Sequence, residues 1–148
     1  MKTKLFSIAA AVLALVFTSC SSDDENQVVI PTPTPAANGF AWTENGSATV
    51  NTAPTATFST QYKTLMAKDA GNATIFEINL DGTGAATYPV PANAVTYIGV
   101  NPMFAATGGE VVITSNANGK VSGTFHATGN GGGITVIDGT FTNIDVIP

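Results

Sequence analysis

KVSGTFHATGNGGGITVIDGTF, residues 120–141, decides the fold of this chain because one short motif occurs in it twice. VSGTF at 121–125 returns as IDGTF at 137–141. Between them lies GNGGG, whose glycines reach the backbone conformations that reverse a chain. We therefore predict that the two motifs are matched strands of one hairpin rather than units of a tandem repeat.

Side chains in the first strand of this hairpin alternate in size and polarity, which is the period of a β-strand. The predicted inward face consists of Val121, Gly123, Phe125 and Ala127, and the outward face of Ser122, Thr124, His126 and Thr128. A glycine beside a buried aromatic indicates a bulge or a close approach of two backbones. We expect both motifs to contain such a contact.

The same period of two extends outward from the hairpin through the rest of the chain. Further strands are predicted over residues 40–43, 47–51, 62–68, 74–80, 86–88, 95–100 and 109–116. Pro89, Pro91 and Pro102 restrict their neighbours to sheet edges or loops. No window beyond the first 19 residues has the period of an amphipathic helix. For residues 39–148 this pattern predicts an all-β domain, an antiparallel two-sheet β-sandwich, with a small β-barrel as the alternative.

Charge excludes one class of partner. Residues 20–148 contain ten acidic residues and three lysines, which gives a net charge of −7. A nucleic-acid partner requires cations that displace counterions from phosphates. We therefore expect no nucleic acid to bind.

The first 19 residues have the pattern of a secretory signal peptide. Lys2 and Lys4 precede an apolar run over residues 5–17, which as a helix is shorter than the hydrocarbon core of a bilayer. A permanent membrane helix is the alternative to a signal peptide. Cys20 follows directly and is the only cysteine of the chain. It therefore has no partner for an internal disulfide, and as a free thiol in an exported protein it would be reactive.

Thr18, Ser19 and Cys20 resemble the lipobox of bacterial lipoproteins, although Phe17 occupies a position where leucine is commoner. The resemblance implies cleavage before Cys20, a diacylglycerol on its thiol and an acyl chain such as palmitate on the new amino group. An ordinary signal peptide with an incidental cysteine is the alternative. No cofactor and no catalytic residue is implied.

Residues 20–38 are predicted to be a disordered tether. Three consecutive acids at 23–25 and the segment PTPTP at 31–35 favour an extended, solvated chain. Serines and acids directly after the cysteine resemble the export signal of Bacteroidota surface lipoproteins. This implies a lipid-anchored outer-membrane protein at the cell surface, with the periplasmic face as the alternative.

Residues 39–145 resemble a domain of unknown function found in small Bacteroidota lipoproteins. The resemblance depends on Trp42 and on the two GTF motifs at 123–125 and 139–141. These are structural motifs, and they imply no enzymatic activity.

The sequence offers few groups for chemistry. His126 is the only histidine, and its outward position predicts a solvated strand residue rather than a catalytic one. No GxSxG motif accompanies it, and no set of thiols or imidazoles could bind zinc. The segment DGTG at 81–84 is half of a calcium loop and lacks the remaining acids. We predict no metal site and no enzyme.

Four aromatic residues are candidates for a ligand-binding surface on which a sugar could stack: Trp42, Tyr62, Tyr88 and Tyr97. The predicted function is a lipid-anchored cell-envelope protein that acts as a surface binding or structural module. Its partner would be a glycan or an envelope protein. The alternative is a carbohydrate- or small-ligand-binding module of a surface uptake system, and a hydrolase is the third choice.

Overall fold

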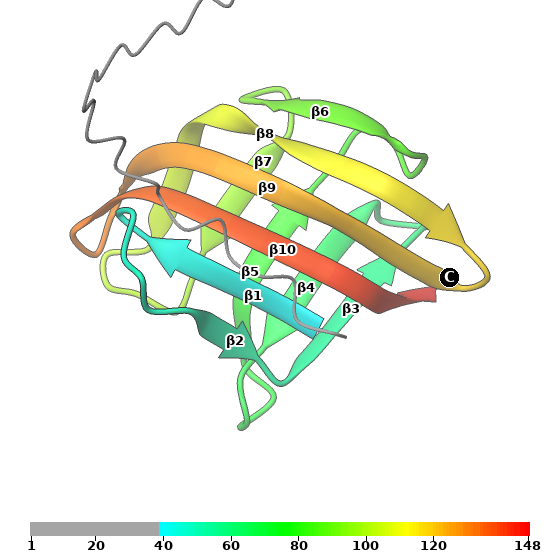
Figure 1. Ribbon diagram of the computed structural model, residues 1–148, viewed down its shortest axis with the longest axis horizontal. Helices are drawn as coiled ribbons and strands as arrows, with labels where there is room; N and C mark the ends of the chain where they lie inside the picture. Colours follow the sequence, from blue (N-terminus) through cyan, green and yellow to red (C-terminus); the bar gives the residue numbers. More distant parts are fainter. Residues whose placement is uncertain (1–38) are drawn as a thin grey trace, which may run out of the picture.

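The computed structural model of this chain describes residues 39–148, all of which form strands, turns or loops (Figure 1). The predicted signal peptide, Cys20 and the tether lie outside the described residues. The strands are β1 (Gly39–Glu44), β2 (Asn51–Ala53), β3 (Thr55–Ser59), β4 (Thr64–Lys68), β5 (Thr74–Asn79), β6 (Ala86–Val90), β7 (Ala94–Tyr97), β8 (Phe104–Ala117), β9 (Lys120–Gly131) and β10 (Ile134–Ile147). The prediction of an all-β domain is confirmed.

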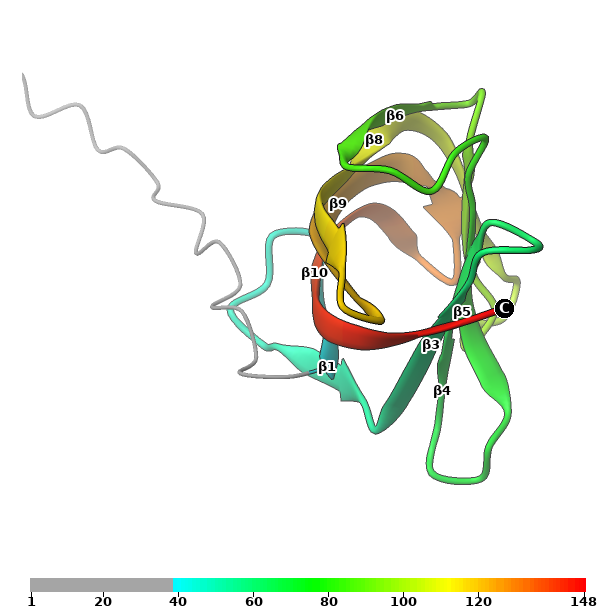
Figure 2. The same cartoon turned by 90° about the vertical axis from the view of Figure 1, so that its right-hand side faces the viewer.

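Seven of these strands close into a barrel in the order β10, β3, β4, β5, β7, β8, β9. Strand β9 pairs with both β8 and β10, which completes the ring. Every neighbouring pair is antiparallel except β10 and β3, which are parallel. Figure 2 shows the barrel with its opening toward the viewer, with β9 and β10 on one side and β3, β4 and β5 on the other. The remaining strands, β1, β2 and β6, extend the sheet outside the ring.

The predicted two-sheet sandwich is wrong, and the barrel alternative describes the fold. The cause is the length of β8 and β10, each with 14 residues. One side of β10 pairs with β1 over residues 137–142 and then with β3 over residues 145–147. Likewise, one side of β8 pairs with β7 and then with β6. A second partner is therefore available where the first one ends, so the seven strands close into a ring, and β2 and β6 are left at the ends of the sheet.

The predicted hairpin of residues 120–141 is confirmed as β9 and β10. Its register places Gly139 opposite Phe125 and Phe141 opposite Gly123. Gly132 and Gly133 make the turn, and both have positive φ angles, 59° and 77°. Glycine adopts this conformation at no steric cost, so the run of glycines favours reversal of the chain at this point.

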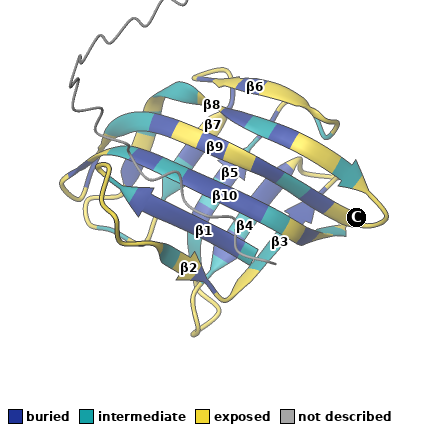
Figure 3. Ribbon diagram, viewed as in Figure 1, coloured by how far each residue is buried: buried dark blue, intermediate teal, exposed yellow. Residues whose placement is uncertain are grey.

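The core fills the inside of the barrel, and buried and exposed residues alternate along β8 and β9 (Figure 3). All four residues predicted to face inward from β9 are buried, which confirms the face assignment. Five aromatic rings pack at the centre, those of Phe40, Trp42, Phe76, Tyr97 and Phe125. Phe76 stacks on Tyr97 at 4.4 Å between ring centroids. Such offset and tilted ring pairs add to the stability gained by burying their surface.

Several strand boundaries differ from the prediction. Residues 47–50 form a loop, and the strand expected there begins at Asn51 as β2. Strand β3 was missed because Pro54 precedes it and Thr55–Ser59 is short and polar at its start. Pro89 lies in β6, which pairs only with β8, so the expected position at a sheet edge is confirmed.

Candidate functional site

A row of titratable side chains crosses the outer face of the three longest strands. His126 on β9 lies opposite Asp138 on β10 and opposite Glu110 on β8. The imidazole Nδ1 of His126 is 2.7 Å from Oδ1 of Asp138, within hydrogen-bond distance. The His126 side chain is 48% exposed, which confirms its predicted outward position. The barrel thus presents one imidazole between two carboxylates.

A cavity of about 210 Å³ opens beside this row. It is lined by Glu110, Val112, Thr124, Phe125, His126, Asp138, Gly139 and Thr140. These residues come from β8, β9 and β10 and from two adjacent rows of the sheet, since Val112, Thr124 and Thr140 lie opposite one another one pleat further along. The cavity therefore combines carboxylates, an imidazole and hydroxyls with an apolar wall.

Thr140 is the unusual member of this set. The residue is 3% exposed, and its Oγ1 is buried without a hydrogen-bond partner. A buried hydroxyl that loses water and gains no partner destabilises the folded state by about 1–3 kcal/mol. Most buried polar groups in proteins are satisfied, so this hydroxyl is an exception among the described residues.

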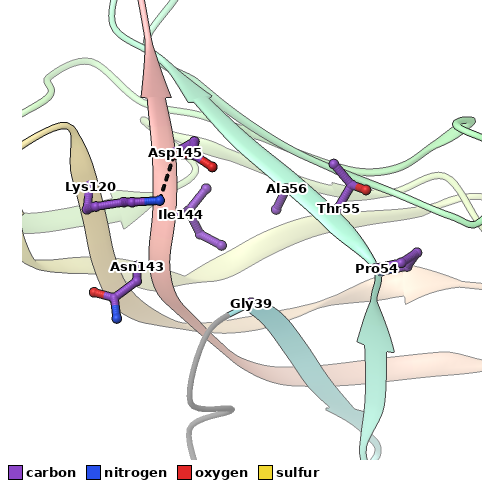
Figure 4. Close-up of a pocket in the computed structure, with 8 residues that line it drawn as sticks. All are labelled: Gly39, Pro54, Thr55, Ala56, Lys120, Asn143, Ile144 and Asp145. Atoms are coloured by element: carbon purple, nitrogen blue, oxygen red, sulfur yellow. Dashed lines mark hydrogen bonds and ion pairs between the residues drawn. The ribbon is translucent and has the colours of Figure 1, made fainter.

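A second, larger depression of about 730 Å³ lies where β1 and β3 separate along β10 (Figure 4). Asn143 and Ile144 of β10 fall between the two pairings and line it together with Gly39 and Pro54. The Nζ of Lys120 is 2.6 Å from Oδ1 of Asp145 on one wall. Both side chains are well exposed, so this ion pair contributes little. This depression is large, but apart from this ion pair its lining contains no cluster of charged or reactive side chains.

The four aromatic candidates do not form one surface. Trp42 is 4% exposed and packs in the core against Tyr97, with 5.5 Å between their ring centroids. Its indole Nε1 donates a hydrogen bond of 2.9 Å to Oε1 of Glu44. Burial, and to a lesser degree the nearby carboxylate of Glu44, raises the pKa of Tyr97.

Tyr88 and Tyr62 lie apart from that pair. Tyr88 is 6% exposed, and its hydroxyl donates a hydrogen bond of 2.7 Å to the carbonyl of Gly84. Burial and the charge of Asp81 raise the pKa of Tyr88. Tyr62 is 72% exposed in the turn between β3 and β4. The structure brings only Trp42 and Tyr97 together, and both serve the core.

The site that the structure does assemble contains Glu110, Asp138 and Thr140, none of which we expected from the sequence. Each is an ordinary solvated residue when considered alone. The signal was present in the hairpin register, because pairing Phe125 with Gly139 also pairs His126 with Asp138. Glu110 required the further pairing of β8 with β9.

The chemistry of this site is limited by what surrounds His126. A histidine oriented by a carboxylate is the arrangement of a general base. Within residues 39–148, however, no hydroxyl or thiol forms a hydrogen bond with the imidazole. Nor does that part of the chain hold a group of three His, Cys, Asp or Glu side chains suited to a metal ion. The arrangement suits hydrogen bonding to a ligand.

The fold and the site thus define a closed, mixed β-barrel with a histidine-containing acidic cavity on its outer face. Comparisons with protein-family models, with curated proteins and with solved structures found no match for this chain. In the described part of the chain, no helix has the length and apolar character needed to cross a membrane.

Proposed function

We propose that this chain is a lipid-anchored protein of the cell envelope and that its barrel is a binding module. The observation that carries the proposal is the lone Cys20, placed immediately after the apolar run and the small residues Thr18 and Ser19. A thioether-linked diacylglycerol and an N-acyl chain would together anchor the protein stably, whereas one chain binds only marginally.

The position of the described domain is compatible with this proposal, because its first strand begins at Gly39, 19 residues after Cys20. An extended segment of that length spans up to about 60 Å. The barrel would therefore stand clear of the lipid head groups. We propose the outer membrane as the site of anchoring and the cell surface as the face of display, with the periplasmic face as the alternative.

A Cys20→Ser variant tests the anchor. Cells expressing it should release the protein into the soluble fraction, because the serine hydroxyl takes no thioether. Ser21→Ala, the neighbouring substitution, should stay with the membrane. Retention of the Cys20→Ser protein in washed membranes would contradict the proposal. Protease added to intact cells then separates the two orientations, since only surface-displayed protein is cut.

The second candidate function, a carbohydrate- or small-ligand-binding module, is favoured by the cavity beside His126. It offers hydrogen-bonding groups of both kinds within reach of one small molecule. Hydrolysis remains the third choice, because the imidazole has a carboxylate partner but no nucleophile bonded to it within residues 39–148.

A further inference from the structure

We propose that the cavity bounded by Glu110, His126, Asp138 and Thr140 binds an uncharged, hydroxyl-rich ligand, such as one sugar unit of a glycan. This inference deepens the proposed binding function and rests on it. It also moves the binding site away from the aromatic candidates, of which Trp42 and Tyr88 are buried.

The negative charge of the cavity determines which ligands bind poorly. Glu110 and Asp138 project from the two strands that flank His126. Neither carboxylate has a lysine partner within residues 39–148, where the two ion pairs are Lys120 with Asp145 and His126 with Asp138. A phosphate or carboxylate entering the cavity would meet like charge at short range, a repulsion that added salt should weaken because these side chains are partly or fully exposed. Anionic ligands are thus disfavoured.

The hydrogen-bonding groups determine which ligands it accepts. Carboxylate oxygens only accept hydrogen bonds, so the ligand must donate. The Nδ1 of His126 is committed to Asp138, which leaves Nε2 for the ligand. The hydroxyl of Thr140 both donates and accepts, and it has no partner in the folded protein. A ligand hydroxyl also does both, whereas an ammonium group only donates. Hydroxyl groups of a ligand can therefore form hydrogen bonds with the carboxylates, with Nε2 of His126 and with the hydroxyl of Thr140.

Thr140 is the observation that separates this cavity from an ordinary acidic surface. Thr140 lines the cavity, and its Oγ1, which water does not reach, has no hydrogen-bond partner in the folded protein. A ligand hydroxyl that displaces the groups covering this oxygen would provide the missing partner. Val112, one row from Glu110, contributes an apolar wall against which the C–H face of a sugar ring can pack. The volume of about 210 Å³ accommodates a single ring rather than an oligosaccharide.

The lone histidine makes the test direct. Because the chain has one histidine, its imidazole proton resonances report this site alone. The purified full-length chain, in detergent, is titrated with methyl glycosides of glucose, galactose and mannose. Glucosamine and glucose 6-phosphate provide the cationic and anionic comparisons. We expect a saturable shift of the His126 resonances with at least one neutral glycoside and at least tenfold weaker binding of glucose 6-phosphate.

Substitutions in the cavity test whether the shift of the His126 resonances arises from binding at this site. Glu110→Gln and Thr140→Val should each weaken the binding of that glycoside about tenfold or more. Glutamine replaces a charged acceptor with a weaker neutral one, and valine has no hydroxyl. Glu77→Gln, the same change on β5 across the barrel, should leave the affinity unaltered. Glu110 is exposed, so its variant should fold whatever happens at Thr140.

Three results would overturn the inference: no saturable shift with any neutral glycoside up to about 100 mM, saturation with glucosamine alone, or unchanged affinity in Glu110→Gln. Membrane retention and ligand binding are read in separate experiments. A failed titration with an intact Cys20 anchor therefore rejects the cavity and not the anchor.

Discussion

Phe125 lies directly opposite Gly139 in the β9–β10 pair, and a Cβ on Gly139 would overlap the Phe125 ring. The relationship is reciprocal, since Phe141 lies opposite Gly123 and its ring would overlap a Cβ there. Each GTF motif thus provides the space that the aromatic side chain of the other motif fills. This exchange explains why the motif occurs twice and why the two copies are in register.

Gly139→Ala should lower the free energy of unfolding by about 1–3 kcal/mol, because the added methyl forces the Phe125 ring out of its place. Gly123→Ala should destabilise more, since its Cβ would also meet the carbonyl oxygen of Val112, which is backbone and cannot turn away. Urea denaturation followed by tryptophan fluorescence measures both. Gly84→Ala is the control, because nothing lies within 4 Å of its Cβ. Equal stability of all three variants would contradict the packing described.

Thr140→Val should raise the free energy of unfolding by about 1 kcal/mol, because it replaces an unpartnered buried hydroxyl with a methyl of similar shape. Thr140→Ser, which keeps the hydroxyl and loses the methyl, should be less stable than the natural protein. Thermal melts of the three proteins make the comparison. Destabilisation by valine would mean that the hydroxyl has a stabilising partner in solution. A gain in stability together with the loss of glycoside binding would show that Thr140 is retained for function.

Asn45 ties the end of β1 to the start of β10, and its removal should loosen that end of the barrel. Its Oδ1 accepts hydrogen bonds from the backbone N–H groups of Thr135 and Val136, and its Nδ2 donates to the carbonyl of Gly133. Its φ of 51° also favours asparagine over alanine.

Asn45→Ala should therefore cost about 1–2 kcal/mol of unfolding free energy. Asn45→Asp keeps the accepting oxygen and should cost less than half as much. Hydrogen exchange at the amides of Thr135 and Val136 provides a local reading, with faster exchange expected in the alanine variant. If both variants exchange alike at these two amides, the side chain does not hold this end.

Alkaline pH should weaken the fold through Tyr97. Because burial raises its pKa above the usual 10.0, the folded protein keeps the phenolic proton at pH values where the unfolded chain has released it. The contribution that the protonated Tyr97 makes to the free energy of unfolding is therefore fully present below the unfolded-state pKa of 10.0. It is lost as the pH rises through the higher pKa of the folded state. Tyr97→Phe should reduce the fall in melting temperature as the pH rises above the usual tyrosine pKa of 10.0. A decline as steep as that of the natural protein would place its origin elsewhere.

The residues of the hairpin predicted more of the fold than any other segment. The GNGGG turn and the two GTF motifs determine which residues pair and which face inward, so local pattern was sufficient there. Barrel closure was not predictable in this way. It depends on the parallel pairing of β10 with β3, in which Asp145 lies opposite Thr57, 88 residues away in the sequence. No local pattern specifies such a contact, and a sandwich satisfies the same alternation of residues.

The candidate site was missed for a related reason. Carboxylates and threonines on the outward face of a strand are usually solvated, so Glu110, Asp138 and Thr140 carried no signal individually. Their significance arises from the register of three adjacent strands. The four aromatic candidates do not form a binding surface, because large rings such as that of Trp42 fill the centre of a small barrel.

The most direct test of the central claim, that a lipid on Cys20 displays this barrel from a membrane, is mass spectrometry of the protein extracted from membranes. We expect a chain that begins at Cys20, with a mass increased by a diacylglyceryl group and an N-linked acyl chain. A mature chain that begins at any other residue, or an unmodified Cys20, would contradict it.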